Sequence, residues 1–547
     1  MSESKTLAKG SLWYFSLGLL IKISGFIYTV ILARFVAQED VGAFAACLSI
    51  LGLFTIISDA GFLNSLGRYV PYLYGSKKFG KLRELVKMSY SGGGIVALIF
   101  SILIFVFAGN IAAYSGKSTI ETPLRILAIF LLLREIHELN KMVMAGRKKM
   151  KEYQGLELLQ TILKLIITII LVLKFGGSVN TISIAFILSF LLVIPIGLYL
   201  LKKESEKWED SKPISPTEKY SLAKEVISFG LMITLASMFA VVIEYSDKIM
   251  LTGMLENSLS EVAIYAMAFG LATIIIIFPG SIVSMFCPMI TELYGQGKKE
   301  EMKKITTISM KWAIMVSVPV IVMMVVFGKN LLTELYGAAY SGGWLVLSLF
   351  TVGLFIRTLF AIPSSVLAAM RRVDIELKVG LATVIANVAL NFFLIPIFRI
   401  NGAALASLLS LSLGVLLIHY YSNKIYGFKF PKEAYKPLIA GIIGFIVIFL
   451  LKEQIFELLD NHLLNIQIGS SQGQLADLVL QKVMKLMILG ILFLVSSTVY
   501  FLALLGLRSF GEDEIDLLEK GLRKIRIPEN YIKLSRTVLE AKYLGSH

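Results

Sequence analysis

The chain has 547 residues and carries 53 lysines and arginines against 38 aspartates and glutamates, so its formal net charge is +15. It is 56% hydrophobic and only 17% charged, with a mean hydropathy of +0.77, whereas soluble globular domains carry about 25% charged residues. This composition excludes most soluble classes of protein. Because the basic residues lie in short patches between long apolar runs, they do not predict a nucleic-acid partner.

The apolar runs predict an all-α protein that crosses a membrane many times. A helix needs about 20 apolar residues to cross the hydrocarbon core of a bilayer. The runs of this length predict fourteen spans: 11–36, 41–66, 89–113, 122–146, 154–174, 180–200, 222–252, 262–291, 306–333, 343–370, 375–398, 401–422, 436–451 and 482–507.

The basic residues predict the orientation of these spans. Short cytoplasmic loops carry an excess of lysine and arginine. If the connections are numbered alternately from an inner N-terminus, 37 of the 53 basic residues lie on the inner side. The first apolar run has no cleavage site after it, which predicts a membrane helix and not a signal peptide. We therefore expect a multi-pass protein of the cell membrane with both termini in the cytoplasm.

Few of the familiar ligand motifs occur in this chain. Cys47 and Cys287 lie in apolar runs and predict neither a disulfide framework nor a thiolate metal site. The run Gly92 to Gly94 is typical of close helix packing. His137 is interpreted as a hydrogen-bonded histidine of the bundle, with titration near neutral pH as the alternative. We expect no metal ion and no bound cofactor.

The sequence repeats itself at an offset of 215 to 226 residues. The matching words are AAYSG at 112 and 338, LAK at 7 and 222, LYG at 73 and 293, and AGRKK at 145 against AAMRR at 368. Six spans separate the copies, so both halves have one orientation and are related by an axis along the membrane normal. Parallel repeats of this kind are typical of transporters. The alternative is a plain helical bundle whose short words match by chance.

The repeat predicts two lobes of six helices, joined by a charged linker with two prolines that suits a hinge. Two further helices follow the second lobe, with a partly amphipathic outer connection between them. The tail is interpreted as a solvated cytoplasmic segment or a short surface helix. The predicted divisions are 1–200 (first lobe), 201–221 (linker), 222–422 (second lobe), 423–507 (two added helices with the outer loop 452–480) and 508–547 (tail).

Three segments resemble a known family. LARFVAQEDVGAFAACLSILGLFTIISDAGFLNSLGRYVP (32–71) contains an Asp-x-Gly element followed by arginine, YSDKIMLTGML with EVAIYAMA (245–268) contains an Asp-Lys pair and a later tyrosine, and NVALNFFLIPIFRINGAALAS (387–407) contains paired asparagines, proline and Gly-Ala-Ala. These segments are similar to the polysaccharide flippases of the multidrug/oligosaccharidyl-lipid/polysaccharide exporter superfamily. The resemblance covers residues 5 to 450.

The resemblance implies movement of a polyprenyl-phosphate- or diphosphate-linked saccharide from the inner to the outer leaflet by alternating access. The implied partners are this lipid-linked saccharide, membrane lipids and enzymes of glycan assembly. One alternative is an ion-coupled multidrug exporter of the same superfamily, which needs acidic residues to hold cationic drugs. A second is a membrane-embedded glycan polymerase or ligase, which leaves the two-lobe repeat unexplained. We expect a transporter and not an enzyme.

Basic residues inside spans are the predicted binding groups for an anionic headgroup. A charge at the bilayer centre costs about 2.5–3.5 kcal/mol, so each one suggests a function. Arg134 and Arg357 are repeat-equivalent and are expected to face each other, where their guanidinium groups can hold a phosphate. The alternative is a pair between Arg134 and Glu138, with Arg357 reaching the interface. Lys22 and Lys164 complete the set, although Lys164 can instead pair with a neighbouring helix.

Three carboxylates are candidates for coupling to H⁺ or Na⁺. Asp59 lies at about the depth of Lys22, so it either carries an ion or neutralises that lysine. Glu244 and Lys248 are an i,i+4 couple, which leaves Asp247 without a partner on its own helix. We therefore expect Asp247 to be a better coupling residue than Glu244.

Overall fold

The computed structural model describes residues 3–208, 213–464, 474–507, 509 and 519. All regular secondary structure in these ranges is helical. The helices before the linker are α1 (Glu3–Phe35), α2 (Gln38–Asp59), α3 (Phe62–Gly75), α4 (Phe79–Tyr114), η1 (Ser118–Ile120), α5 (Glu121–Ala128), α6 (Phe130–Gly146), α7 (Met150–Phe175), α8 (Val179–Ser205) and η2 (Glu206–Trp208). The later helices are α9 (Pro216–Met254), α10 (Leu259–Ala272), η3 (Thr273–Ile276), α11 (Ile277–Gly295), α12 (Lys299–Val326), α13 (Gly328–Tyr336), η4 (Ala338–Gly343), α14 (Trp344–Ala369), α15 (Val373–Tyr426), η5 (Lys432–Ala434), α16 (Tyr435–Leu464) and α17 (Gln474–Gly506).

The predicted all-helical membrane fold is confirmed. Among the described residues, eleven helices are long and apolar enough to cross a membrane, or twelve if the bent α9 counts as one span. Two predicted spans run together in α15, which breaks at Arg399 with non-helical angles (φ 52°, ψ −129°). The predicted span 122–146 is divided between α5 and α6, and four charged residues make α6 less apolar than the other helices. The count of fourteen stays a prediction.

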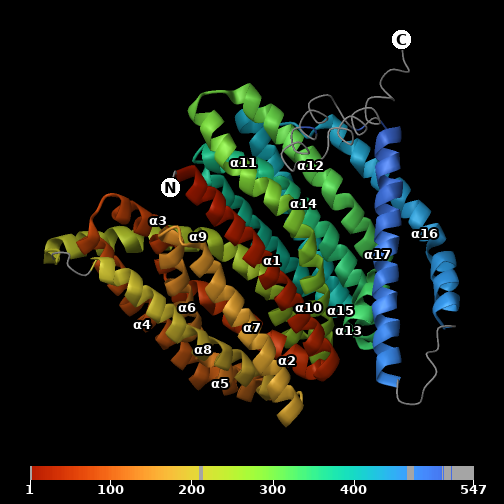
Figure 1. The fold of residues 1–547 in the computed structure, drawn as a ribbon, viewed down its shortest axis with the longest axis horizontal. Helices are drawn as coiled ribbons and strands as arrows, with labels where there is room; N and C mark the ends of the chain where they lie inside the picture. Colours follow the sequence, from red (N-terminus) through yellow and green to blue (C-terminus); the bar gives the residue numbers. More distant parts are fainter. Residues whose placement is uncertain (1–2, 209–212, 465–473, 508, 510–518, 520–547) are drawn as a thin grey trace. The chain divides into compact units, whose positions relative to one another are not determined.

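Contacts divide the chain into two compact units. The first unit is Met1–Met267 with Val384–Ala406, and the second unit is Ala268–Thr383 with Ser407–His547. In the first unit α7 packs against α1 and α8, α6 packs against α3, α4 and α8, and α9 lies along α2 and α3. In the second unit α12 packs against α11, α14 and α16, and α16 and α17 lie side by side (Figure 1). The lobes predicted from the repeat stay a prediction.

The internal repeat is visible in the backbone of four turns between helices. The turns after α3 and α11 contain Lys77 and Gly297, and the turns after α6 and α14 contain Lys148 and Arg371, all with φ between 56° and 74°. In each turn this residue donates its N–H three residues back, and the next residue donates five residues back, which is the hydrogen-bond pattern of a Schellman cap. The offsets of 220 and 223 residues are those of the LYG and AGRKK words. The AAYSG copies differ, since the first closes the end of α4 and the second forms η4.

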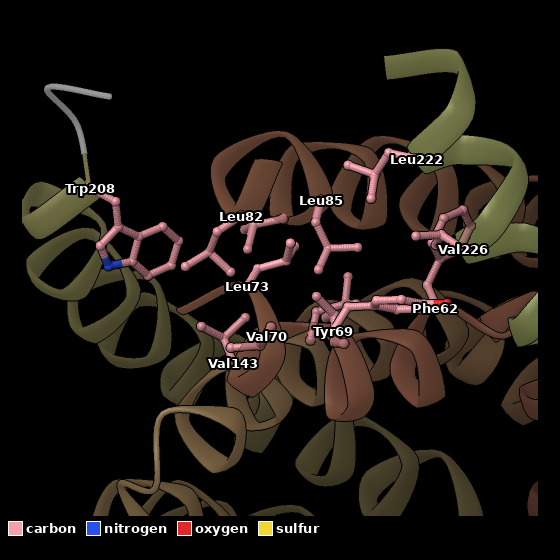
Figure 2. Packing of buried hydrophobic residues seen from close by; sticks show 13 residues of the cluster. Phe62, Tyr69, Val70, Leu73, Leu82, Leu85, Val143, Trp208, Leu222 and Val226 are labelled. Carbon is pink, nitrogen blue, oxygen red and sulfur yellow. The ribbon is translucent and has the colours of Figure 1, made fainter. Parts of the chain in front are cut away.

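The predicted hinge is partly docked onto the first unit. Trp208 at the end of η2 is only 2% exposed and lies in a buried cluster with Leu73 of α3 and Leu82 of α4 (Figure 2). The same cluster includes Val226 of α9. Farther along, Ser215 accepts a hydrogen bond from the N–H of Glu218 and forms a capping box, with proline at the first position of α9. Residues 209–212 and most of the tail 508–547 lie outside the described residues.

The connection that was predicted to lie outside has helical ends. Predicted loop residues 452–464 continue α16, and α17 begins at Gln474. Residues 465–473, at the centre of this predicted amphipathic segment, lie outside the described residues. The two added helices are therefore longer than their apolar cores.

Helices α3 and α9 touch through their backbones, and this contact gives a testable prediction. Gly61 has φ +82°, and a Cβ there lies 2.2 Å from the carbonyl carbon of Gly230. We expect Gly61→Ala to lower the free energy of unfolding by about 2 kcal/mol or more, because it adds backbone strain to overpacking. Gly94→Ala is the matched control, since its Cβ meets nothing within 4 Å. Thermal unfolding in detergent measures both, and equal melting temperatures contradict the prediction.

Candidate functional site

Helix α6 carries a ladder of ionisable residues through the first unit. Arg134, Glu138 and Lys141 follow one another at spacings of three and four residues, which place them on one face of the helix. The Lys141 ammonium lies 2.8 Å from Glu138 Oε1 and 2.5 Å from Glu157 Oε2 of α7. The predicted alternative, an ion pair between Arg134 and Glu138, is therefore replaced by the pair between Glu138 and Lys141.

The same helix contributes to a small, partly buried cluster of ionisable residues. His137 is 2% exposed, its ring packs edge-on against Phe190 of α8, and its Nε2 lies 3.5 Å from Glu157 Oε2. His137, Glu138 and Glu157 are close enough together for a shared ion, but the Lys141 ammonium lies against both carboxylates. The group is therefore an ion-pair cluster in which the lysine balances the two acids.

Asp59 lies at the turn between α2 and α3, where Ala60 and Gly61 both have positive φ. Its side chain is 5% exposed, and Oδ1 accepts a hydrogen bond of 2.8 Å from the N–H of Leu63, so the carboxylate caps the start of α3. Arg134 is within electrostatic range of the Asp59 carboxylate. The expected pair with Lys22 is not formed, because Lys22 is exposed on α1.

Asp247 is the centre of a buried polar cluster on α9, α10 and α15. Its Oδ1 accepts hydrogen bonds from Asn391 Nδ2 at 2.6 Å and Asn387 Nδ2 at 3.2 Å, and its Oδ2 accepts one from the Tyr265 hydroxyl at 2.5 Å. Ser246 donates to Asn387 Oδ1 at 2.8 Å. All five side chains are less than 9% exposed. The structure thus gives Asp247 partners on α10 and α15.

The remaining acidic candidate is placed differently. Glu244 is exposed on α9. The ammonium group of the neighbouring Lys248 lies 4.9 Å from the centre of the Tyr245 ring. Glu244 and Asp247 both interact electrostatically with this ammonium group. The Tyr245 ring in turn lies against α2, where a Cβ on Gly52 would stand 2.4 Å from it. Glu244 thus contributes charge near the buried cluster without belonging to it.

The three basic candidates of the first unit, Lys22, Arg134 and Lys164, lie on three different helices, α1, α6 and α7. Arg134 is half-buried on α6, and Lys164 of α7 lies between the rings of Tyr28, at 4.6 Å, and Phe186, at 5.9 Å. Such cation–π contacts are the structural alternative for Lys164, because α1 and α8 supply the rings. Arg357 is exposed on α14 in the second unit. The prediction that Arg134 and Arg357 face each other stays a prediction.

Polar contacts join α3 and α9 in the first unit. Ser65 donates to the carbonyl of Val226 at 2.9 Å, and the Tyr69 hydroxyl donates to Glu225 at 3.0 Å. The Arg68 guanidinium lies 4.3 Å from the centre of the Phe229 ring of α9. Burial and the adjacent Glu225 carboxylate raise the pKa of Tyr69. Helix α9 is thus held to α3 by several polar contacts.

Two family models match the chain. The model described as "Polysaccharide biosynthesis protein" matches residues 7–294, more than half of the chain, and the model "MatE" matches residues 232–393. The chain belongs to the polysaccharide biosynthesis protein family. The resemblance to the flippase branch of the multidrug/oligosaccharidyl-lipid/polysaccharide exporter superfamily is thereby confirmed.

Relatives of this family member extend over most of its length. An uncharacterized membrane protein of Methanocaldococcus jannaschii is 22% identical over 480 residues, which are 85% of this chain and 93% of the relative. A probable low-salt glycan biosynthesis flippase of Haloferax volcanii is 19% identical over 400 residues, 73% of this chain and 79% of the relative. The lipid II flippase MurJ in an inward closed conformation has the same fold, with a TM-score of 0.66 at 14% identity, covering 90% of this chain and 99% of that one.

In this polysaccharide biosynthesis protein, the buried acid Glu135 and the acid Glu157 were not predicted as site residues. Glu135 is 0% exposed and Glu157 is half-buried in the ion-pair cluster. A signal for the first was present, since Glu135 follows Arg134 inside a predicted span. The paired asparagines at 387 and 391 were noticed only as a family pattern. Their contact with Asp247 joins segments 140 residues apart, which no local spacing indicates.

Proposed function

We propose that the protein is a flippase that moves polyprenyl-phosphate- or diphosphate-linked oligosaccharide from the inner to the outer leaflet of the cell membrane by alternating access. The observation that carries this proposal is the match of the polysaccharide biosynthesis model over residues 7–294. It is supported by a relative that is named a probable flippase and aligns with 73% of this chain, and by the MurJ-like fold. The protein acts as a transporter and not as an enzyme.

The basic residues inside the helices bind the anionic headgroup in this proposal. Arg134 is the strongest candidate because it is half-buried and is followed by the ion-pair cluster on α6. Arg357 is its repeat equivalent, while Lys22 and Lys164 assist from α1 and α7. A planar guanidinium can hold a phosphate through two parallel hydrogen bonds, so the arginines contribute most of the binding.

The energy source in this proposal is an ion gradient. Asp247 is the preferred coupling residue for H⁺ or Na⁺, because it is a carboxylate buried inside a membrane helix, where it contacts the side chains of Asn387 and Asn391. Asp59 and Glu244 are weaker candidates, since Asp59 caps α3 and Glu244 is exposed. Both termini lie in the cytoplasm, and glycan-assembly enzymes supply and remove the lipid-linked saccharide.

Transfer of a fluorescent polyprenyl-diphosphate oligosaccharide between the leaflets of proteoliposomes tests the function. We expect transfer by the parent and a loss of about tenfold or more in the double variant Arg134→Ala with Arg357→Ala, since each charged hydrogen bond contributes about 1.5–3 kcal/mol. Arg125→Ala with Arg372→Ala is the matched control, because both arginines are exposed and paired with neighbouring acids. Equal transfer by the double variant and the control contradicts the headgroup site.

A multidrug exporter is the second candidate, and the MatE match over residues 232–393 favours it. The same proteoliposomes distinguish the two functions when they are loaded with a cationic dye. Efflux of the dye without transfer of the lipid-linked probe would assign the protein to drug export. Transfer of the probe without efflux of the dye supports the flippase.

A further inference from the structure

Glu135 of α6 is a buried carboxyl that the proposed headgroup and coupling sites do not use. Its side chain is 0% exposed, and neither carboxyl oxygen has a hydrogen-bond partner among the described residues. The carboxyl lies against α4, where a Cβ on Gly93 would stand 2.7 Å from Glu135 Oε1. The glycine run of α4 therefore leaves room for this carboxyl group, in addition to permitting helix packing.

The charged groups around Glu135 come from its own helix and from α2. Asp59 of α2 and Arg134 and Glu138 of α6 interact electrostatically with the Glu135 carboxyl group. Helix α4 contributes Tyr90, whose hydroxyl donates to Asn140 Oδ1 at 2.8 Å.

The other helices packed against α6 add little that can compensate the charge. Helix α3 contributes the ring of Phe62 beside Gly93, while Arg68 of α3 is directed at α9. The acid that α7 contributes near α6, Glu157, is bound to Lys141. Helix α8 has no acidic residue, histidine, lysine or arginine from residue 179 to 201.

An ionised carboxylate in this position is unfavourable. Moving a charge out of water without a partner is strongly unfavourable, and such a group is neutralised instead. A second acid, Asp59, increases the cost of ionising Glu135, and Arg134 reduces it. The Asp247 carboxylate is the opposite case, because donors occupy both of its oxygens.

We propose that Glu135 is a proton-binding site of the first unit, which holds a proton in the structure described here and releases it when water reaches the carboxyl or when Arg134 moves to pair with it. A phosphate bound at Arg134 removes the compensating charge, so binding of an anionic headgroup and protonation of Glu135 favour each other. This second part rests on the proposed function. The proton site itself does not.

Infrared spectroscopy of the full-length protein in lipid nanodiscs tests the site without any substrate. We expect the parent at neutral pH to show the C=O stretching band of a protonated carboxyl in apolar surroundings, and Glu135→Gln to lack it. Glu138→Gln is the matched control, because Glu138 lies three residues away and is paired with Lys141; it should keep the band. The same band in Glu135→Gln, or its absence from the parent, would overturn the proposal.

A second pair of variants tests the same assignment in case Glu135→Gln does not fold. Gly93→Ala presses a methyl group against Glu135 Oε1, whereas Gly94→Ala points into open space. We expect the first to shift the band and the second to leave it in place. A band that is unmoved in folded Gly93→Ala counts against the assignment to Glu135.

Transport then tests the link to the headgroup. An imposed pH gradient should accelerate transfer of the fluorescent lipid-linked oligosaccharide several-fold in the parent and have no effect in Glu135→Gln. Acceleration retained in Glu135→Gln overturns the link. If the infrared band is assigned to Glu135 but no lipid-linked probe is transferred, the proposed function fails and the proton site stands.

Discussion

Replacing Asp247 by alanine is expected to destabilise the protein by about 3 kcal/mol or more. The variant removes the acceptor of three hydrogen bonds, and the amides of Asn387 and Asn391 and the hydroxyl of Tyr265 stay buried without it. A hydrogen bond to a charged group contributes about 1.5–3 kcal/mol. The melting temperature and the midpoint of chemical unfolding in detergent measure the loss.

Glu244→Ala is the matched control for this prediction. It removes a carboxylate one turn earlier on α9, but Glu244 is exposed, so we expect a change within about 0.5 kcal/mol. Asp247→Asn should lie between the two, because its amide oxygen still accepts from one asparagine. If Asp247→Ala unfolds at the same temperature as Glu244→Ala, the cluster does not stabilise α9 against α15.

The same variants separate stability from coupling. If Asp247 carries the coupling ion, Asp247→Asn keeps the fold and loses the acceleration of transfer by a sodium or proton gradient. Glu244→Ala should keep that acceleration. A gradient response that survives in Asp247→Asn would leave Asp247 with a structural role only.

The sequence predicted the helices well because each signal for a helix is local. Apolar runs fix the length of a span, and the caps at Ser215 and Gly427 are encoded within a few residues of the helix ends. The LYG and AGRKK words fall on turns of one backbone conformation, since a Schellman cap depends on adjacent residues. Helix α6 was harder, because its charges interrupt the apolar run that began in α5.

Local sequence rules did not predict most of the side-chain partners, because these lie on other helices. Counting residues from a turn gives the depth of Lys22 and Asp59, but not the face of the helix on which each lies, and the two side chains do not meet. Asp247 finds its partners 140 and 144 residues later. The i,i+4 rule favoured Arg134 with Glu138, whereas Lys141 is held by Glu138 and by Glu157 of the next helix. The tertiary partner decides which local pair forms.

Replacing Lys141 by methionine is expected to destabilise the protein by about 3 kcal/mol. Methionine fills a similar volume but leaves Glu138 and Glu157 facing each other without their shared cation. Lys141 is 5% exposed, and the Glu138 and Glu157 side chains are 23% and 33% exposed, so water solvates the two unbalanced carboxylates only in part. Thermal unfolding in detergent, together with the yield of monodisperse protein, measures the effect.

The pair between Lys303 and Glu300 supplies the control for Lys141→Met. It has the same spacing of three residues and the same distance of 2.8 Å as the pair between Lys141 and Glu138, but the Glu300 side chain is 85% exposed. We expect Lys303→Met to cost less than about 1 kcal/mol, because water and salt screen an exposed pair. Adding Glu157→Gln to Lys141→Met should recover part of the loss by removing one of the two unbalanced charges. A Lys141→Met protein as stable as Lys303→Met would show that burial does not strengthen this ion pair.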